Sequence, residues 1–299
     1  MSILPRQRDS DHVIDRIHYW RPGQVPGVAG VTRRCSLRLG LVGSREMFLD
    51  LEPEAEIFLL EPDNYAEVIE AVSLDLILIE SAWNPLSEDW YQFQLAGTPA
   101  RQMLDDLLER AVALGCPSAF WLTEGAAYAR DYAEVARQCD AVFCADHAAV
   151  DVLDAFDIRA RHLAPCVQPA RFHPFHDDPF RRDGGHPVYF DGWADADRAL
   201  VETGVLKAVA ERTGLSIFES RYRLLSSRRS ALSGLAPYIQ GCLTPGLHPV
   251  ALRRAEVVLS LDGPESERVA REWLAVKAAA TGNVLVHLGE LGDRKSTRL

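Results

Sequence analysis

The sequence lacks a long apolar run and a basic stretch, and each absence excludes a class of protein. No segment reaches the roughly 18 consecutive apolar residues of a membrane-spanning helix, and the opening MSILPRQRDSD has no apolar core of the kind found in signal peptides. The formal net charge of −11 is unfavourable for binding nucleic acid or an anionic membrane surface. We therefore expect a cytoplasmic protein without these partners.

Closely paired cysteines are also missing. The six cysteines include no C-x-x-C pair, and Cys139 and Cys144 would lie on opposite faces of a strand. We expect them to be reduced, buried thiols. His176 and His186 show no ligand spacing either, so we predict no metal site.

Apolar runs that alternate with helical stretches are the main feature present. The 299 residues are 47% hydrophobic, which is ample for two domains at about 100–200 residues each. Strands that are apolar on both faces and are separated by helices indicate a parallel sheet. The predicted strands of a first domain are LRLGLVG (37–43), EIFLLE (56–61), LDLILIE (74–80), SAFWLT (118–123) and DAVFCAD (140–146), and a helix is predicted over 100–115.

The same alternation restarts after a segment rich in proline. We predict an irregular extension over 1–35, a first Rossmann-like domain over 36–164, a linker over 165–186 and a second Rossmann-like domain over 187–292. The second domain has predicted strands PVYFDGW, LSIFES, AEVVLSLD and NVLVHL, with helices over 195–213, near 245–254 and over 265–281. The fold class is α/β, with two parallel-sheet domains.

The stretch LDLILIESAW, residues 74–83, ends a core strand in a carboxylate and an indole. Open parallel sheets bind ligands outside the carboxyl ends of their strands, where Glu80 and Trp83 are predicted to lie. An indole face suits the C–H surface of a sugar ring, and a carboxylate accepts bonds from hydroxyl groups. The alternative is that Glu80 caps the loop and Trp83 packs beneath it.

Several segments, read in order, resemble the spore-maturation CgeB-like glycosyltransferase family. They are EPDNY…LILIESAW, FWLTEGAAY, CDAVFCADHAAV and VQPARFHPF, and weaker matches follow in PVYFDGW and LAPYIQGCLTPGLHPVALRRAEVVLSLD. The resemblance covers roughly residues 37 to 290. It implies the GT-B architecture, in which two Rossmann-like domains face a cleft. It further implies a nucleotide-sugar donor as co-substrate, a sugar, protein or small-molecule acceptor, and catalysis without a metal or another cofactor.

The resemblance places the acceptor side in the first domain and the linker. Glu124 matches the glutamate of the family's K-E-D-P motif and is our candidate catalytic residue, because a carboxylate there could take the proton of the acceptor hydroxyl. The alternative is an acid at a helix N-terminus. Gln168 and His173 resemble the family's Q-P-x-x-H-N-P linker, with one additional residue before the histidine, and a hydrogen-bonded hinge is the alternative. Glu80 and Trp83 complete the acceptor-side candidates.

The donor side is predicted in the second domain. Gly192 and Trp193 follow its first strand, where glycine permits close approach of phosphates, and Arg221 is the candidate cation for the diphosphate. Family members carry a glutamate for the donor ribose five residues before a glycine. Here that position holds Lys277, while Glu272 lies several residues too early.

We weigh three alternatives to a metal-independent glycosyltransferase against the sequence. A nicotinamide enzyme needs G-x-G-x-x-G, of which only Gly40 and Gly43 are present. Asp195 and Asp197 have the spacing of D-x-D, the metal-binding motif of the other major glycosyltransferase class. They fall at a predicted helix start, where acidic residues commonly act as caps. The drift at Lys277 favours a non-catalytic relative that binds a nucleotide or sugar or acts as a scaffold.

The last seven residues, DRKSTRL, resemble a sequencing-library adapter translated in frame. We therefore expect 293–299 to be an artefact, and the natural chain to continue so that the second domain is truncated here. The alternative is an ordinary charged tail.

Overall fold

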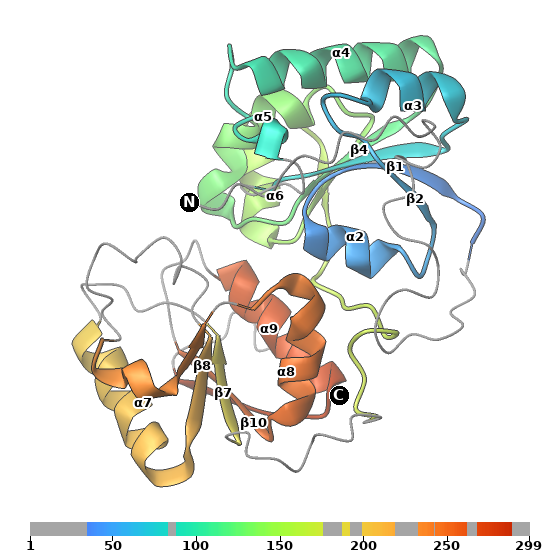
Figure 1. Ribbon diagram of the computed structural model, residues 1–299. Helices are drawn as coiled ribbons and strands as arrows, with labels where there is room; N and C mark the ends of the chain where they lie inside the picture. The colour runs from blue at the N-terminus through green and yellow to red at the C-terminus, as the bar shows by residue number, and fades with distance from the viewer. Residues whose placement is uncertain are drawn as a thin grey trace. The chain divides into compact units, whose positions relative to one another are not determined.

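The computed structural model describes residues 35–82, 88–175, 187–191, 199–218, 233–241, 243–261 and 268–288. The described strands form two sheets, one of six strands and one of five (Figure 1). The chain divides into two compact units, residues 1–121 with 131–142 and residues 122–130 with 143–299. Within the described ranges, no helix combines the length and the apolar character needed to cross a membrane.

The first sheet contains the strands that the apolar runs predict, in the spatial order β2-β1-β3-β4-β5-β6. Its strands are β1 (Arg38–Val42), β2 (Glu56–Leu59), β3 (Leu76–Glu80), β4 (Ser118–Leu122), β5 (Ala141–Cys144) and β6 (Ala160–His162). Its helices are α2 (Arg45–Leu51), α3 (Tyr65–Ala71), α4 (Pro99–Ala113), α5 (Ala129–Ala136) and α6 (His147–Asp154), with the 3-10 turns η1 (Glu88–Trp90) and η2 (Ala126–Tyr128). The pairs β1–β2, β1–β3 and β3–β4 are parallel.

The helix predicted over 100–115 shows how local sequence sets these elements. Thr98 caps α4, its hydroxyl accepting the Arg101 N–H at 3.1 Å, and Pro99 occupies the first helical position, where no N–H is needed. The helix is followed by Gly115, whose φ of 69° is the left-handed conformation that glycine favours. In Figure 1, α4 lies beside α3, to which the Tyr65 hydroxyl joins it by donating to Asp106 Oδ2 at 2.6 Å.

The second sheet has the order β11-β10-β7-β8-β9, and each of its strands runs parallel to its neighbours. Its strands are β7 (Val188–Asp191), β8 (Leu215–Phe218), β9 (Ile239–Gly241), β10 (Val257–Leu261) and β11 (Val284–Leu288). Its helices are α7 (Ala199–Thr213), α8 (His248–Arg254) and α9 (Arg268–Ala280), with the 3-10 turns η3 (Ser233–Tyr238) and η4 (Pro245–Leu247). The predicted fold class, α/β with two parallel-sheet domains, is confirmed.

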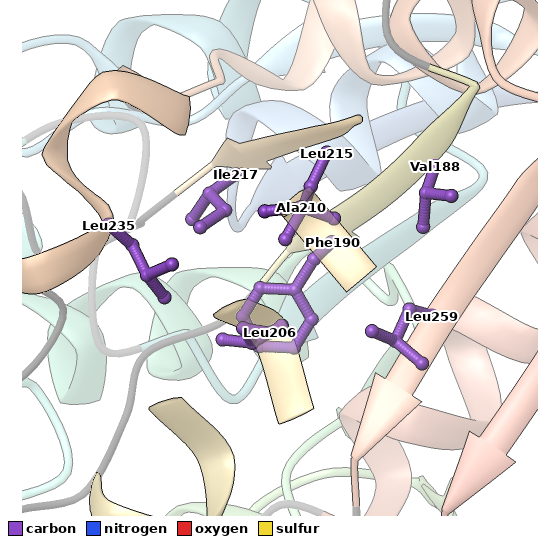
Figure 2. Packing of buried hydrophobic residues seen from close by; sticks show 8 residues of the cluster. All are labelled: Val188, Phe190, Leu206, Ala210, Leu215, Ile217, Leu235 and Leu259. Carbon is purple, nitrogen blue, oxygen red and sulfur yellow. The ribbon is translucent and has the colours of Figure 1, made fainter. Parts of the chain in front are cut away.

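Successive residues of the second sheet's strands are buried on opposite faces. Phe190 of β7 and Leu259 of β10 pack against α7, in the cluster that Figure 2 shows with Leu206 and Ala210. Tyr189 and Val258, one residue earlier in each strand, pack on the other face in a cluster with Leu252 of α8 and Ala278 of α9. Because both faces are covered, strands of this sheet read as continuous apolar runs in the sequence.

The beginning of the predicted linker is attached to the second hydrophobic core. Phe172 is 2% exposed and belongs to the cluster of Tyr189, Leu252 and Val258. The Arg171 guanidinium donates to the Pro245 carbonyl at 2.7 Å. Arg171 and Phe172 therefore attach the start of the linker to this core, and 176–186 lie outside the described residues.

Candidate functional site

Carboxylates lie at or just beyond the carboxyl ends of three neighbouring strands in the first sheet. Glu80 is the last residue of β3, Glu124 follows the end of β4 by two residues, and Asp146 follows the end of β5 by two. The spatial order β3-β4-β5 makes these strands neighbours. This end of a parallel sheet is where ligands bind in α/β proteins.

Glu80 is buried and braces the loop between β1 and α2. It is 7% exposed, and its Oε2 accepts the Ser44 N–H at 2.7 Å. A Cβ added at Gly43 would lie 3.0 Å from Oε2, so the missing side chain there lets the carboxylate approach the loop. These contacts are those of the loop-capping alternative. The acceptor role of Glu80 stays a prediction, and Trp83 lies outside the described residues.

Glu124 occupies the three-residue connection between β4 and η2. The first helical residue is Ala126, so Glu124 precedes the turn and does not lie within it. Its side chain is partly exposed. A partly exposed carboxylate at this place can contact a ligand. The acceptor-side role of Glu124 stays a prediction.

The connection that carries Glu124 is anchored at both ends. On one side, the Leu122 carbonyl accepts the Ala145 N–H at 2.8 Å. On the other, the Ala126 N–H donates to Asp146 Oδ2 at 3.0 Å. Both anchors come from the neighbouring residues Ala145 and Asp146, so the position of Glu124 is set by the end of β5.

Asp146 is a residue that the sequence analysis did not single out. It is 2% exposed and caps α6, with Oδ1 accepting the Ala148 N–H at 2.9 Å. The same carboxylate forms an ion pair with the guanidinium of Arg268, the first residue of α9. The signal in the sequence was the aspartate that ends the predicted strand DAVFCAD and directly precedes the helical HAAVDVL, a typical N-cap position.

The two linker candidates lie in a turn of the described segment. Gln168 is 5% exposed, and its Oε1 accepts the Ala170 N–H at 3.0 Å, while its carbonyl accepts the Arg171 and Phe172 N–H groups. His173 places its ring centroid 6.1 Å from that of Phe175. The bonds of Gln168 organise the turn, as the hinge alternative expects, and the acceptor-side role of both residues stays a prediction.

Two donor-side candidates lie on α9. Glu272 approaches the Arg268 guanidinium, with 3.9 Å between Nε and Oε1. Lys277 places its ammonium 5.5 Å from the centre of the Phe172 ring, a cation–π contact with the start of the linker. Gly192, Trp193 and Arg221 fall outside the described residues, as do Asp195 and Asp197.

Burial sets the chemical state of the thiols. It raises the pKa of both Cys139 and Cys144 to about 12, so each is a neutral thiol near pH 7. The expectation of buried thiols is confirmed for Cys144 and is wrong for Cys35 and Cys166, which are exposed, while Cys116 and Cys139 are half-buried. Cys242 lies outside the described residues.

Several solved structures are similar to this chain at low identity. No known protein-family model and no curated protein matches the sequence. Anabaena Alr3699/HepE in complex with UDP and glucose is 13% identical, with 86% of this chain and 87% of that chain covered and a TM-score of 0.48. The same protein in complex with UDP is 10% identical with a TM-score of 0.44, at 86% and 87% coverage. A mutant O-GlcNAc transferase from Thermobaculum terrenum is 14% identical with a TM-score of 0.47, and 87% of this chain spans 59% of that one.

Proposed function

We propose that this protein is a CgeB-like glycosyltransferase of the GT-B type. It transfers a sugar from a nucleotide-sugar donor to an acceptor hydroxyl and uses no metal ion or further cofactor. The observation that carries the proposal is Glu124, a partly exposed carboxylate on an anchored connection at the carboxyl end of a parallel strand. The order of motifs along the chain, which resembles that family, supports the same conclusion.

Glu124 supplies a general base in this mechanism. The acceptor oxygen forms a bond to the anomeric carbon of the donor sugar, the bond from that carbon to the diphosphate oxygen breaks, and the acceptor proton passes to the carboxylate. A positioned carboxylate that takes the proton as the new bond forms accelerates such a step about 10²–10⁴-fold. The electron pair of the broken bond leaves with the nucleoside diphosphate.

The remaining candidates divide between acceptor and donor. Gln168 and His173 are proposed on the acceptor side, together with Glu80 and Trp83. Gly192, Trp193 and Arg221 are proposed on the donor side, where backbone N–H groups and the guanidinium would meet the diphosphate charge. Glu272 is the proposed partner of the donor ribose, since Lys277 is engaged with the ring of Phe172.

A second candidate is a non-catalytic relative that binds a nucleotide or sugar, or serves as a scaffold. The contact between Lys277 and Phe172 favours it, because the family's ribose-binding position is used here in a packing contact. As a binding protein, this candidate predicts ligand binding without transfer, and as a scaffold it predicts neither.

Binding and turnover separate these two candidates. A specific nucleotide sugar should raise the melting temperature, since a ligand at 100 times its Kd stabilises the folded state by about 2.7 kcal/mol. Release of nucleoside diphosphate with an added acceptor then reports transfer. Glu124→Gln should lower turnover about 10²–10⁴-fold while donor binding is unchanged.

The matched control is Glu134→Gln on α5, whose carboxylate is 66% exposed and pairs with Arg137 on the surface. It should leave turnover unchanged. Wild-type turnover in Glu124→Gln would remove this residue from the mechanism. Binding of no nucleotide sugar would refute the glycosyltransferase and the ligand-binding relative, and would leave the scaffold.

A further inference from the structure

We propose that Asp146, held by Arg268, is the positioning residue for the connection that carries Glu124. The proposal rests on the proposed function only for the chemical role of Glu124. The juxtaposition itself involves the loop after β4, the loop after β5 and the start of α9, all within the unit 122–130 and 143–299.

The Asp146 carboxylate is shared among three donors. Oδ2 accepts the Ala126 N–H at 3.0 Å, Oδ1 accepts the Ala148 N–H at 2.9 Å, and the Arg268 guanidinium donates to Oδ1 as well. Capping α6 requires only the bond to Ala148. The bond to Ala126 is additional and acts on a different segment, two residues from Glu124.

The buried Asp146 carboxylate relies on its ion pair with Arg268. The side chain of Asp146 is 1% exposed and that of Arg268 is 26% exposed. A carboxylate so fully removed from water is costly unless it is paired, and removing one member of a buried pair leaves the other charge uncompensated. Loss of Arg268 should therefore move Asp146 toward water and release the Ala126 N–H.

The consequence is a mechanical link between α9 and Glu124. Arg268 is the first residue of the helix that connects β10 to β11, and Glu272, a proposed donor-side residue, lies one turn further along it. A displacement of the start of α9 would be transmitted through Asp146 to Ala126. A shift of α9, on the proposed donor side, would thereby change the position of the Glu124 carboxylate.

Amide hydrogen exchange tests the link directly and needs no substrate. In Arg268→Gln, the Ala126 amide should exchange about tenfold faster than in the wild type, because its acceptor has lost its counter-charge. The Leu60 amide, which donates to the Leu41 carbonyl in the first sheet, should keep its wild-type rate. Arg268→Lys retains the positive charge, so the exchange rate of its Ala126 amide should lie between those of the wild type and Arg268→Gln.

The matched control is Arg212→Gln, an exposed arginine at the end of α7 in the same unit. Exchange of the Ala126 amide should be unchanged in it. Wild-type exchange of this amide in Arg268→Gln would overturn the proposal. If that variant does not fold, Asp146→Asn gives the same test, since it lacks the charge but keeps the shape.

Kinetics distinguish positioning from general loss of structure. Arg268→Gln should lower kcat at least about tenfold with the KM for the acceptor unchanged, and Arg268→Lys should recover part of kcat. A KM effect alone would overturn the positioning role. If the Ala126 amide exchanges faster in Arg268→Gln but the wild-type protein shows no transfer activity, the link is supported and the proposed function is refuted. If this exchange is unchanged but Glu124 is essential for transfer, the link is refuted and the proposed function is supported.

Discussion

Replacing Glu80 decides whether this carboxylate braces a loop or serves a ligand. Its Oε2 accepts the Ser44 N–H at 2.7 Å within a buried site, so the structure predicts a loss of stability on removal. Glu80→Gln keeps the shape and an acceptor oxygen but no charge. Glu80→Ala removes the acceptor and leaves the Ser44 N–H without it.

The expected sizes follow from the bond between Glu80 and Ser44. A hydrogen bond to a charged group contributes about 1.5–3 kcal/mol and a neutral one about 0.5–1.5 kcal/mol, so Glu80→Gln should cost about 1 kcal/mol. Glu80→Ala should cost about 2–4 kcal/mol, because the orphaned donor and the lost packing of the side chain add together. Glu70→Gln, at a surface carboxylate that is 67% exposed, should stay within about 0.5 kcal/mol.

Urea unfolding measures these differences as shifts of the midpoint at constant slope. Exchange of the Ser44 amide provides a local check, since this N–H is the donor that loses its acceptor. Wild-type midpoints in both Glu80 variants would refute the bracing role. Lost turnover in Glu80→Gln at wild-type stability would establish the acceptor-side role instead.

Three further outcomes are expected. Iodoacetamide at pH 8 should modify the exposed Cys35 in the folded protein but Cys139 only after denaturation, because burial raises the pKa of Cys139 to about 12; prompt labelling of Cys139, read by peptide mass, would contradict this. Burial and, to a smaller extent, nearby carboxylates raise the pKa of Glu61 in the folded protein. The stability that Glu61 contributes is therefore present below its ordinary pKa and is lost as the pH rises through its pKa in the folded state. Glu61→Gln should therefore raise the melting temperature at pH 7 and leave it unchanged near pH 3.5, and equal effects at both values would exclude this cause. Phe172→Ala should cost about 3–5 kcal/mol in denaturant unfolding, since the ring is 2% exposed, whereas Phe175→Ala, at a ring that is 75% exposed, should cost little; similar small losses would show that the start of the linker is not anchored by this ring.

The strands and the longer helices follow from local signals. The run LDLILIE contains β3 because its residues are apolar on both faces. The start of α4 lies within one residue of its predicted position because the apolar residues of this segment recur at helical spacing. The region predicted as a helix near 245–254 contains a 3-10 turn followed by the short α8, with Pro245 and Pro249 each at the beginning of one of them. Such distinctions depend on packing that a periodic pattern does not record.

For the candidate site, the sequence predicted which residues lie at the strand ends but not what each of them contacts. Residues at strand ends could be nominated from the sequence, because parallel strands place their carboxyl ends at one edge. The role of each could not. Glu80 meets Ser44 only because β1 and β3 are neighbours in the sheet, although β2 lies between them in the chain.

By itself, the sequence determined the α/β class, the two parallel sheets and the position of Glu124 after a core strand, since these depend on patterns within about ten neighbouring residues. Only the tertiary structure decided that Asp146 joins Ala126 to Arg268. That ion pair connects residues 122 positions apart. An aspartate that caps a helix reads the same in a sequence whether or not a distant guanidinium reaches it, because pairing and burial are properties of the packed chain.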